Sequence, residues 1–228
     1  MKRFTKKEKT EIDFLGNMVR ISGQINGLKL FLEDVNKFIQ LTEQGLKTEK
    51  SKDFDSEKLH NLKYHYKYTQ GDLLRKSIII STVILLESEI DNYCRDFKSL
   101  KKLKVSYKDF NGSLLDRFKS FTTKILALSF DFNSSQWLSI KELYEIRNCL
   151  VHNYGSLENF GKSEVIKTFI KKHKNFEISD NEFIEISNEG CLECIEIVNI
   201  FFKNITRIAM DCFPEKYHTT EFEWMESL

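Results

Sequence analysis

Apolar residues recur every three or four positions along most of this chain, which is the spacing of one buried face of an α-helix. The first such stretch covers about residues 9–46, and its predicted inward positions are Phe14, Met18, Ile21, Ile25, Leu28, Leu32, Val35 and Ile39. Residues 47–69 are polar with scattered aromatic side chains. We interpret that segment as a connection with room for a short helix.

The clearest helical pattern covers about residues 70–100. One stripe at helical spacing contains Ile80, Ile84, Glu87, Asp91 and Cys94. Two carboxylates within an apolar stripe are notable, because burying an unpaired carboxylate costs several kcal/mol or so. Glu87 and Asp91 therefore each need a partner if this stripe is buried.

Two further helices are predicted in the middle of the chain. One covers about residues 113–130. The next begins after Asn133 or Ser134, either of which can cap it, and runs to about Val151. Its inward stripe is Trp137, Ile140, Tyr144, Arg147 and Val151. An arginine thus interrupts an apolar face near the end of this helix.

Strands are predicted only in the last third of the chain. A short helix is expected over about residues 163–174. Alternating apolar and polar residues then surround the turn-forming sequence at 179–181, which predicts a β-hairpin over about 175–187. A long helix follows over about 188–212 and ends before Pro214; its inward positions are Leu192, Ile195, Val198, Phe202, Ile205 and Ala209.

Composition fits one domain with an extension. The chain has 228 residues, one proline and nine glycines, so few positions oblige a helix to break. With 35 basic and 34 acidic residues, the net charge of +1 gives no global argument for nucleic-acid binding. Local basic runs at 2–9, 98–104 and 171–174 are usually solvated faces, and RNA-backbone contact is the alternative for each.

The five cysteines do not point to a disulfide framework. Their number is odd and no signal peptide opens the chain, so we expect a cytoplasmic protein with reduced thiols. Cys191 and Cys194 have the spacing of half a metal site, but no second pair accompanies them, and we expect core cysteines and no metal. No apolar stretch approaches the roughly 20 residues of a membrane span, and no cofactor is expected.

The segment with the most chemistry is Arg147-Asn148-Cys149-Leu150-Val151-His152, followed by Tyr154. On an ideal helix residues five apart lie about 140° apart. The helix is expected to end near Val151, and if it unwinds there His152 can turn toward Arg147. A guanidinium binds phosphate oxygens in a bidentate manner, and an imidazole exchanges a proton near neutral pH. Together they suit metal-independent RNA cleavage, in which the 2′-OH is the nucleophile.

This segment resembles the R-x(4–6)-H motif of HEPN domains, including the polar residue after the arginine, and through Tyr154 the R-x4-H-x-Y form of HEPN toxins. The resemblance covers about residues 70–212. It implies a HEPN-like all-α bundle, here with an N-terminal helical extension at 1–69, the hairpin, and a tail at 213–228. It also implies a metal-independent endoribonuclease with Arg147, Asn148 and His152 as catalytic residues. The acid that faces them, or supports them from a second layer, would be Glu87, with Asp91 one helical turn further on.

The resemblance further implies partners. HEPN ribonucleases typically form homodimers in which two motifs meet on RNA, and many are toxins or antiphage abortive-infection effectors. In one group a minimal nucleotidyltransferase acts as antitoxin and modifies the motif tyrosine, here Tyr154. The alternative is a HEPN-like module without catalysis that binds RNA, a nucleotide or a protein partner, with Arg147 paired to an acid and His152 at a helix C-terminus.

Overall fold

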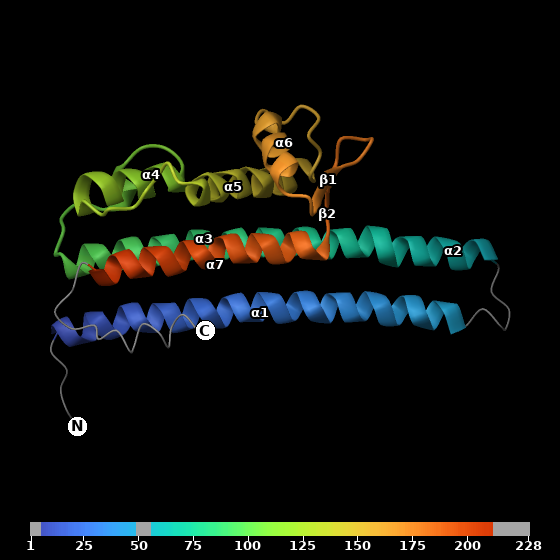
Figure 1. Ribbon diagram of the computed structural model, residues 1–228, viewed down its shortest axis with the longest axis horizontal. Coiled ribbons are helices and arrows are strands. Elements are labelled where there is room, and N and C mark those ends of the chain that lie inside the picture. The colour runs from blue at the N-terminus through green and yellow to red at the C-terminus, as the bar shows by residue number, and fades with distance from the viewer. Residues whose placement is uncertain (1–5, 49–55, 212–228) are drawn as a thin grey trace, which may run out of the picture. The chain divides into compact units, whose positions relative to one another are not determined.

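The computed structural model describes residues 6–48 and 56–211, and these residues are mostly helical (Figure 1). The protein is therefore all-α with one small sheet, as the periodicity predicts. The helices are α1 (Lys6–Thr48), α2 (Ser56–Tyr64), α3 (Gly71–Leu100), α4 (Leu114–Phe121), α5 (Ser135–Asn153), α6 (Ser163–Lys172) and α7 (Asn188–Asp211). The predicted helix end at Pro214, Cys212 and the tail lie outside the described residues.

The chain forms two compact units. Residues 6–25, 84–141 and 197–211 belong to one, which we call the aromatic unit. Residues 26–48, 56–83 and 142–196 belong to the other, which we call the hairpin unit. Helices α1, α3, α5 and α7 each contribute one segment to each unit. Both units are thus assembled from segments that are distant in sequence.

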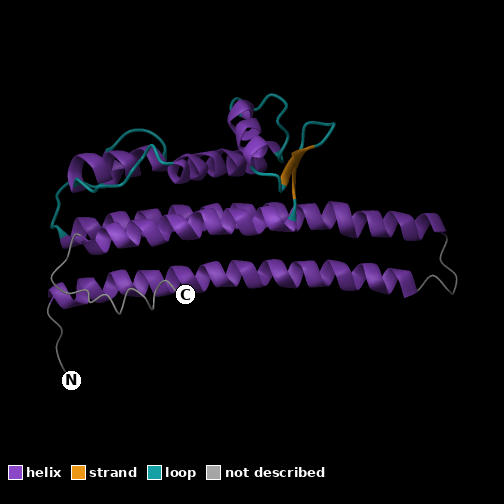
Figure 2. Cartoon of the chain, viewed as in Figure 1, coloured by secondary structure: helices purple, strands orange, loops and turns teal. Residues whose placement is uncertain are grey.

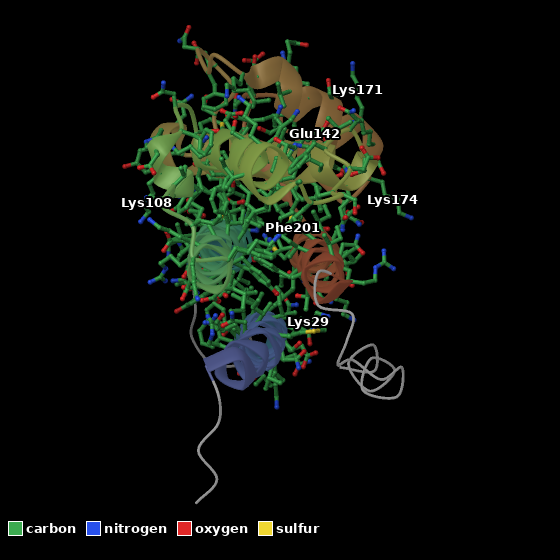
Figure 3. All side chains as sticks on the ribbon, turned by 90° about the vertical axis from the view of Figure 1, so that its left-hand side faces the viewer. Lys29, Lys108, Glu142, Lys171, Lys174 and Phe201 are labelled. Atoms are coloured by element: carbon green, nitrogen blue, oxygen red, sulfur yellow. The ribbon has the colours of Figure 1, made fainter. Side chains whose placement is uncertain are left out.

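Aromatic rings fill the core of the aromatic unit. Phe118 of α4 is fully buried and packs against Phe132, Trp137 and Phe201, with ring centroids 5.9–6.1 Å apart. Phe201 of α7 points into the interior in Figure 3 and also stands edge-on to Phe202. Such ring pairs add about 0.5–1.5 kcal/mol each beyond the area that they bury. The many phenylalanines of the sequence therefore hold this unit together.

The buried acid of α3 is Glu89, not Glu87 or Asp91. Its carboxylate is fully buried and accepts a bidentate pair of hydrogen bonds from the Arg20 guanidinium of α1. Glu87 and Asp91 are only half-buried, and Ile84 on the same stripe is exposed. Of the predicted stripe of α3 only Cys94 is buried, so the prediction was wrong at its other positions. The buried face instead contains Ile78, Ile79, Val83, Leu86, Ile90, Tyr93 and Phe97.

Helix α4 is shorter than its periodicity predicts. Ser113 and Asp116 form a reciprocal capping box at its start, which satisfies two backbone N–H groups. After Phe121 the chain widens into one π-helical turn at Thr122–Leu126 and stops at Ala127, whose φ of 52° is left-handed. The prediction of a helix to residue 130 was wrong because these turns end it. Ser134 caps α5, as predicted, by accepting a hydrogen bond from the Trp137 N–H.

The predicted hairpin is confirmed in the hairpin unit. Strands β1 (Phe176–Ile178) and β2 (Ile184–Ile186) pair antiparallel, with Phe176 opposite Ile186 and Glu177 opposite Glu185. Figure 2 shows this hairpin beside α6. Buried Phe176 stands edge-on to Phe169 of α6, whose ring also stacks on His173 at 3.9 Å. The hairpin therefore has an apolar anchor on its inner face.

The hairpin also binds the chain that leaves α5. The Ile184 N–H donates to the Gly155 carbonyl at 2.9 Å, and the Leu157 N–H donates to the Glu182 carbonyl at 2.8 Å. Ser156 and Phe183 form an isolated antiparallel bridge between the same two segments. The hairpin thus fixes the loop that follows the Arg147–His152 motif.

Other helices of the hairpin unit agree with their predicted limits to within a few residues. Helix α2 and a π-helical turn at His65–Gln70 occupy the predicted polar connection. Leu192 of α7 was expected to face inward but is exposed. In the described part of the chain, no helix is both long and apolar enough to cross a membrane.

Candidate functional site

The motif residues occupy the last two turns of α5. This helix remains intact through Asn153, so His152 lies inside its final turn. The expected end near Val151 was wrong by two residues, and the helix does not unwind there. Because the helix is continuous, Arg147 and His152 stay about 140° apart around its axis. One copy of the motif therefore directs its arginine and its histidine to different sides of α5.

Arg147 is held by neighbours on its own helix. Its Nη1 donates a hydrogen bond to Oδ1 of Asn148 at 3.0 Å, and its guanidinium carbon lies 5.6 Å from the centre of the Tyr144 ring. Asn148 in turn donates from Nδ2 to Oε2 of Glu145 at 3.4 Å. Glu145 also forms an ion pair with Lys162 from the loop before α6. Arg147 and Asn148 are both half-buried, so each keeps a solvent-facing part.

His152 and Tyr154 are the exposed members of the motif. The Tyr154 side chain is 84 % exposed, and its φ of 54° is left-handed. Gly155 follows with a φ of 85°, and its N–H donates to the Cys149 carbonyl at 3.1 Å. A non-glycine residue at positive φ is uncommon and strained unless its surroundings impose it. The backbone after α5 therefore projects the Tyr154 ring into solvent.

Side-chain hydrogen bonds hold this turn in place. Asn153 donates from Nδ2 to the carbonyls of Ser156 and Glu158, at 2.6 and 3.0 Å. The thiol of buried Cys149 donates to the Ser156 carbonyl. Burial raises the pKa of Cys149 to about 11, against an opposing effect of the Lys76 charge. At neutral pH this cysteine is a protonated structural thiol.

A lysine that the sequence did not indicate stands beside the motif. A Cβ at Gly155 would lie 3.4 Å from Nζ of Lys76 on α3. Lys76 pairs with Asp72 one turn earlier at 2.7 Å. Its proximity to Gly155 depends on long-range packing, since 79 residues separate the two positions in the sequence. Helical spacing alone could not predict that Lys76 lies near Gly155.

The two candidate acids lie in the aromatic unit, whereas Arg147 lies in the hairpin unit. Asp91 accepts a hydrogen bond from the Tyr107 hydroxyl and pairs with Arg95 and Lys108 at 3.1 Å. Burial alone would raise the pKa of Asp91, but these hydrogen bonds and positive charges together lower it. These partners of Asp91 are all side chains of its own unit. The carboxylate that the hairpin unit itself places next to the motif is Glu145.

Cys191 and Cys194 are buried in α7, as expected for core residues. The Cys191 thiol donates to the Arg75 carbonyl, and burial raises its pKa to about 12. Burial raises the pKa of Cys194 well above its ordinary value. Within residues 6–48 and 56–211 the structure brings together no group of three or more His, Cys, Asp or Glu side chains suited to a metal ion.

Comparison with known proteins identifies no relative. No family model, no curated protein and no solved structure matches this chain.

Proposed function

We propose that this protein is a metal-independent endoribonuclease of the HEPN type, acting in the cytoplasm as a toxin or an abortive-infection effector. The observation that supports it is the arrangement at the end of α5. A half-buried arginine, held by an asparagine, is followed within the same two turns by an exposed histidine. These groups match the demands of phosphodiester cleavage through the 2′-OH.

In this mechanism His152 removes the proton of the ribose 2′-OH, and the 2′-oxygen attacks the adjacent phosphorus. Arg147 donates two N–H groups to the phosphate oxygens and stabilises the negative charge that develops there. The bond from phosphorus to the 5′-oxygen breaks, and that oxygen takes up a proton. The products are a 2′,3′-cyclic phosphate and a 5′-hydroxyl. Asn148 keeps the guanidinium oriented through its 3.0 Å hydrogen bond.

The continuous helix makes a homodimer part of the proposal. Within one copy, Arg147 and His152 point about 140° apart and do not meet on one phosphate. In a symmetric pair, Arg147 of one protomer and the partner's His152 face the same cleft. A two-fold interface of this type repeats the site twice, which fits the dimeric arrangement that the motif implies.

The test is cleavage of a 5′-labelled single-stranded RNA by purified protein, with EDTA present throughout. We expect cleavage by the wild type, and loss of at least about 100-fold in His152→Ala, since general acid–base catalysis contributes about that much or more. The control is His60→Ala, because His60 is also an exposed histidine of the hairpin unit. Unchanged cleavage by His152→Ala, or equal loss in His60→Ala, would contradict the proposal.

The alternative is a module that binds RNA without cutting it. It is favoured if Arg147→Ala weakens RNA binding while the wild type produces no cyclic phosphate. The contacts of half-buried Arg147 with Asn148 and the Tyr144 ring are compatible with such binding.

Regulation by a nucleotidyltransferase is a further part of the proposal. The Tyr154 hydroxyl would attack the α-phosphorus of ATP, and pyrophosphate would leave. The 84 % exposure of Tyr154 supports this role, because a second enzyme can reach the ring. Bulky modification beside Lys76 and the end of α5 would obstruct RNA. The proposal predicts that Tyr154→Phe remains toxic in the presence of such an antitoxin, whereas the wild type is neutralised.

A further inference from the structure

The hairpin unit contains a pocket that the motif does not explain. Its volume is about 740 Å³, within the usual range of about 300–1,000 Å³ for small-molecule sites. Side chains from α3, from the hairpin, from the start of α7 and from Tyr154 line it. Every lining residue belongs to the hairpin unit. The pocket is therefore a feature of one compact part of the chain, beside the loop after α5.

The Arg75 side chain indicates what kind of ligand the pocket binds. This half-buried arginine lines the pocket, and its Nε is buried without a hydrogen-bond partner among the described residues. Its guanidinium lies against the backbone of Gly71, where a Cβ would stand 3.1 Å from Nη1. The neighbouring acid, Asp72, is paired with Lys76. A guanidinium in such a setting is stabilised by an anion, and phosphate fits its planar donors best.

The hairpin contributes two acidic side chains to the pocket lining. Glu177 and Glu185 are direct partners across the two strands, are exposed, and both line the pocket. Like charges directly opposite each other destabilise a strand pair. A ligand that donates hydrogen bonds to these carboxylates offsets that repulsion. The pocket lining thus contains both an arginine that can bind an anion and carboxylates that can accept hydrogen bonds.

Aromatic rings complete the lining. Tyr64, Tyr154 and Phe183 contribute to the pocket and are 59 %, 84 % and 41 % exposed. Exposed rings beside a cation are the usual platform for a nucleobase, which stacks on them through its flat face. A ligand that fits this lining needs a flat ring, an anionic group and hydrogen-bond donors, and nucleotides combine all three.

We propose that this pocket binds a guanine nucleotide, with its phosphate on Arg75, its base stacked on the exposed rings, and its base edge on Glu177 and Glu185. Guanine presents two neighbouring donors, N1–H and the N2 amino group, to a carboxylate. Uracil presents one donor between two carbonyl oxygens, which a carboxylate repels. The source of the nucleotide is either a free molecule or a guanosine within single-stranded RNA. Only the second source rests on the proposed ribonuclease function.

The experiment is calorimetric titration of the full-length protein with 5′-GMP, guanosine and 5′-UMP. We expect 5′-GMP to bind roughly 10- to 100-fold more tightly than guanosine, since the charge-assisted phosphate contact accounts for that difference. Arg75→Gln should reduce 5′-GMP affinity to that of guanosine and leave guanosine binding unchanged. The double variant Glu177→Gln/Glu185→Gln should abolish the preference for 5′-GMP over 5′-UMP.

The matched control is Lys171→Gln, which removes an exposed positive charge from α6 outside the pocket lining. Figure 3 shows Lys171 pointing outward. Equal binding of 5′-GMP and 5′-UMP, no binding, or equal loss in Arg75→Gln and Lys171→Gln would overturn the proposal. Thermal melting of each variant identifies any loss that comes from unfolding. If Arg75→Gln does not fold, the titrations are repeated with Arg75→Lys, which retains the charge.

Competition separates the two sources. If RNA is the source, a short single-stranded RNA with one guanosine displaces 5′-GMP, and the same RNA with adenosine in its place does not. If the source is a free nucleotide, neither RNA competes. His152→Ala should bind 5′-GMP like the wild type. If the protein binds 5′-GMP but cuts no RNA, the proposed ribonuclease function is disproved and the pocket assignment stands. If it cuts RNA but binds no nucleotide, the pocket assignment is disproved and the ribonuclease function stands.

Discussion

The two units differ in the partners that their charged and polar side chains have. In the aromatic unit buried Glu89 has a bidentate arginine partner, buried Tyr93 hydrogen-bonds Thr206, and rings around Phe118 fill the core. In the hairpin unit Arg75 has a buried Nε without a hydrogen-bond partner among the described residues, and two glutamates oppose each other on the hairpin. Satisfied polar groups stabilise a fold, whereas unsatisfied ones at a surface pocket are where a ligand gains most. Nε2 of Gln136 in the aromatic unit is also buried without a hydrogen-bond partner among the described residues, so the contrast rests on Glu89, Tyr93 and the ring core on one side and on the pocket around Arg75 on the other.

The largest stability effect should therefore come from the aromatic core. Phe118→Ala removes a fully buried ring that contacts three other rings, and we expect a loss of about 3–5 kcal/mol in the free energy of unfolding. The control is Phe183→Ala, because Phe183 is 41 % exposed in the hairpin unit and should lose less than about 1 kcal/mol. Urea titration followed by circular dichroism measures both. Equal losses would remove the distinction between the units.

The buried ion pair gives the next largest effect. Arg20→Met leaves the fully buried Glu89 carboxylate without its bidentate partner, and we expect a loss of about 2–3 kcal/mol. The value lies below that of a fully buried pair because the Arg20 side chain is 39 % exposed. The additional change Glu89→Leu should recover much of the loss. Arg95→Met, at a pair whose arginine is 63 % exposed, should change stability by less than about 0.5 kcal/mol.

In the hairpin unit a backbone position should be the most sensitive. Gly155→Ala places a Cβ at a φ of 85° and 3.1 Å from Cδ2 of Leu150, and we expect a loss of about 1–2 kcal/mol. Gly161→Ala is the matched control, since nothing lies within 4 Å of its Cβ and its φ is not positive. Differential scanning calorimetry compares the two melting temperatures. A Gly155→Ala protein as stable as Gly161→Ala would show that the turn after α5 is not constrained.

The smallest effect concerns acid stability. Because hydrogen bonds and positive charges lower the pKa of Asp91 below its ordinary 3.8, its ionised form favours the folded state. That contribution is fully present above pH 3.8 and disappears as pH falls through the lower folded-state pKa. Asp91→Asn should therefore be less stable than the wild type at pH 6, with the difference shrinking below pH 4. Urea midpoints measured from pH 3 to pH 6 test this. A difference that stays constant with pH would contradict it.

Local patterns predicted the helices and the hairpin well because each depends on neighbours in sequence. Helix α1 buries Ile21, Ile25, Leu32 and Val35, all among its predicted inward positions. Helix α3 was harder, because apolar residues from Ile78 to Leu86 surround it on several sides and allow more than one choice of buried face. Only its partner Arg20, 69 residues away in the sequence, distinguishes Glu89 from Glu87.

In the candidate site, too, the features set by local sequence were predicted and those set by tertiary packing were not. Arg147, Asn148, His152 and Tyr154 were predicted as one group because spacing alone places them near one helix end. The end of α5 was misplaced by two residues, which reversed the expectation for His152. Arg75, Lys76 and the facing glutamates of the hairpin were missed, because tertiary packing alone brings α3 and the hairpin to the same pocket.

The division of four helices between the two units has a consequence for synthesis on the ribosome. The hairpin unit includes residues up to Glu196, and the aromatic unit needs α7 residues from Ile197 onward, Phe201 among them. Neither unit can close its core until nearly all of the described chain has left the exit tunnel. An incomplete nascent chain therefore holds Arg147 and His152 without the packing that positions them. Translation itself delays the appearance of the assembled site until α7 has been made.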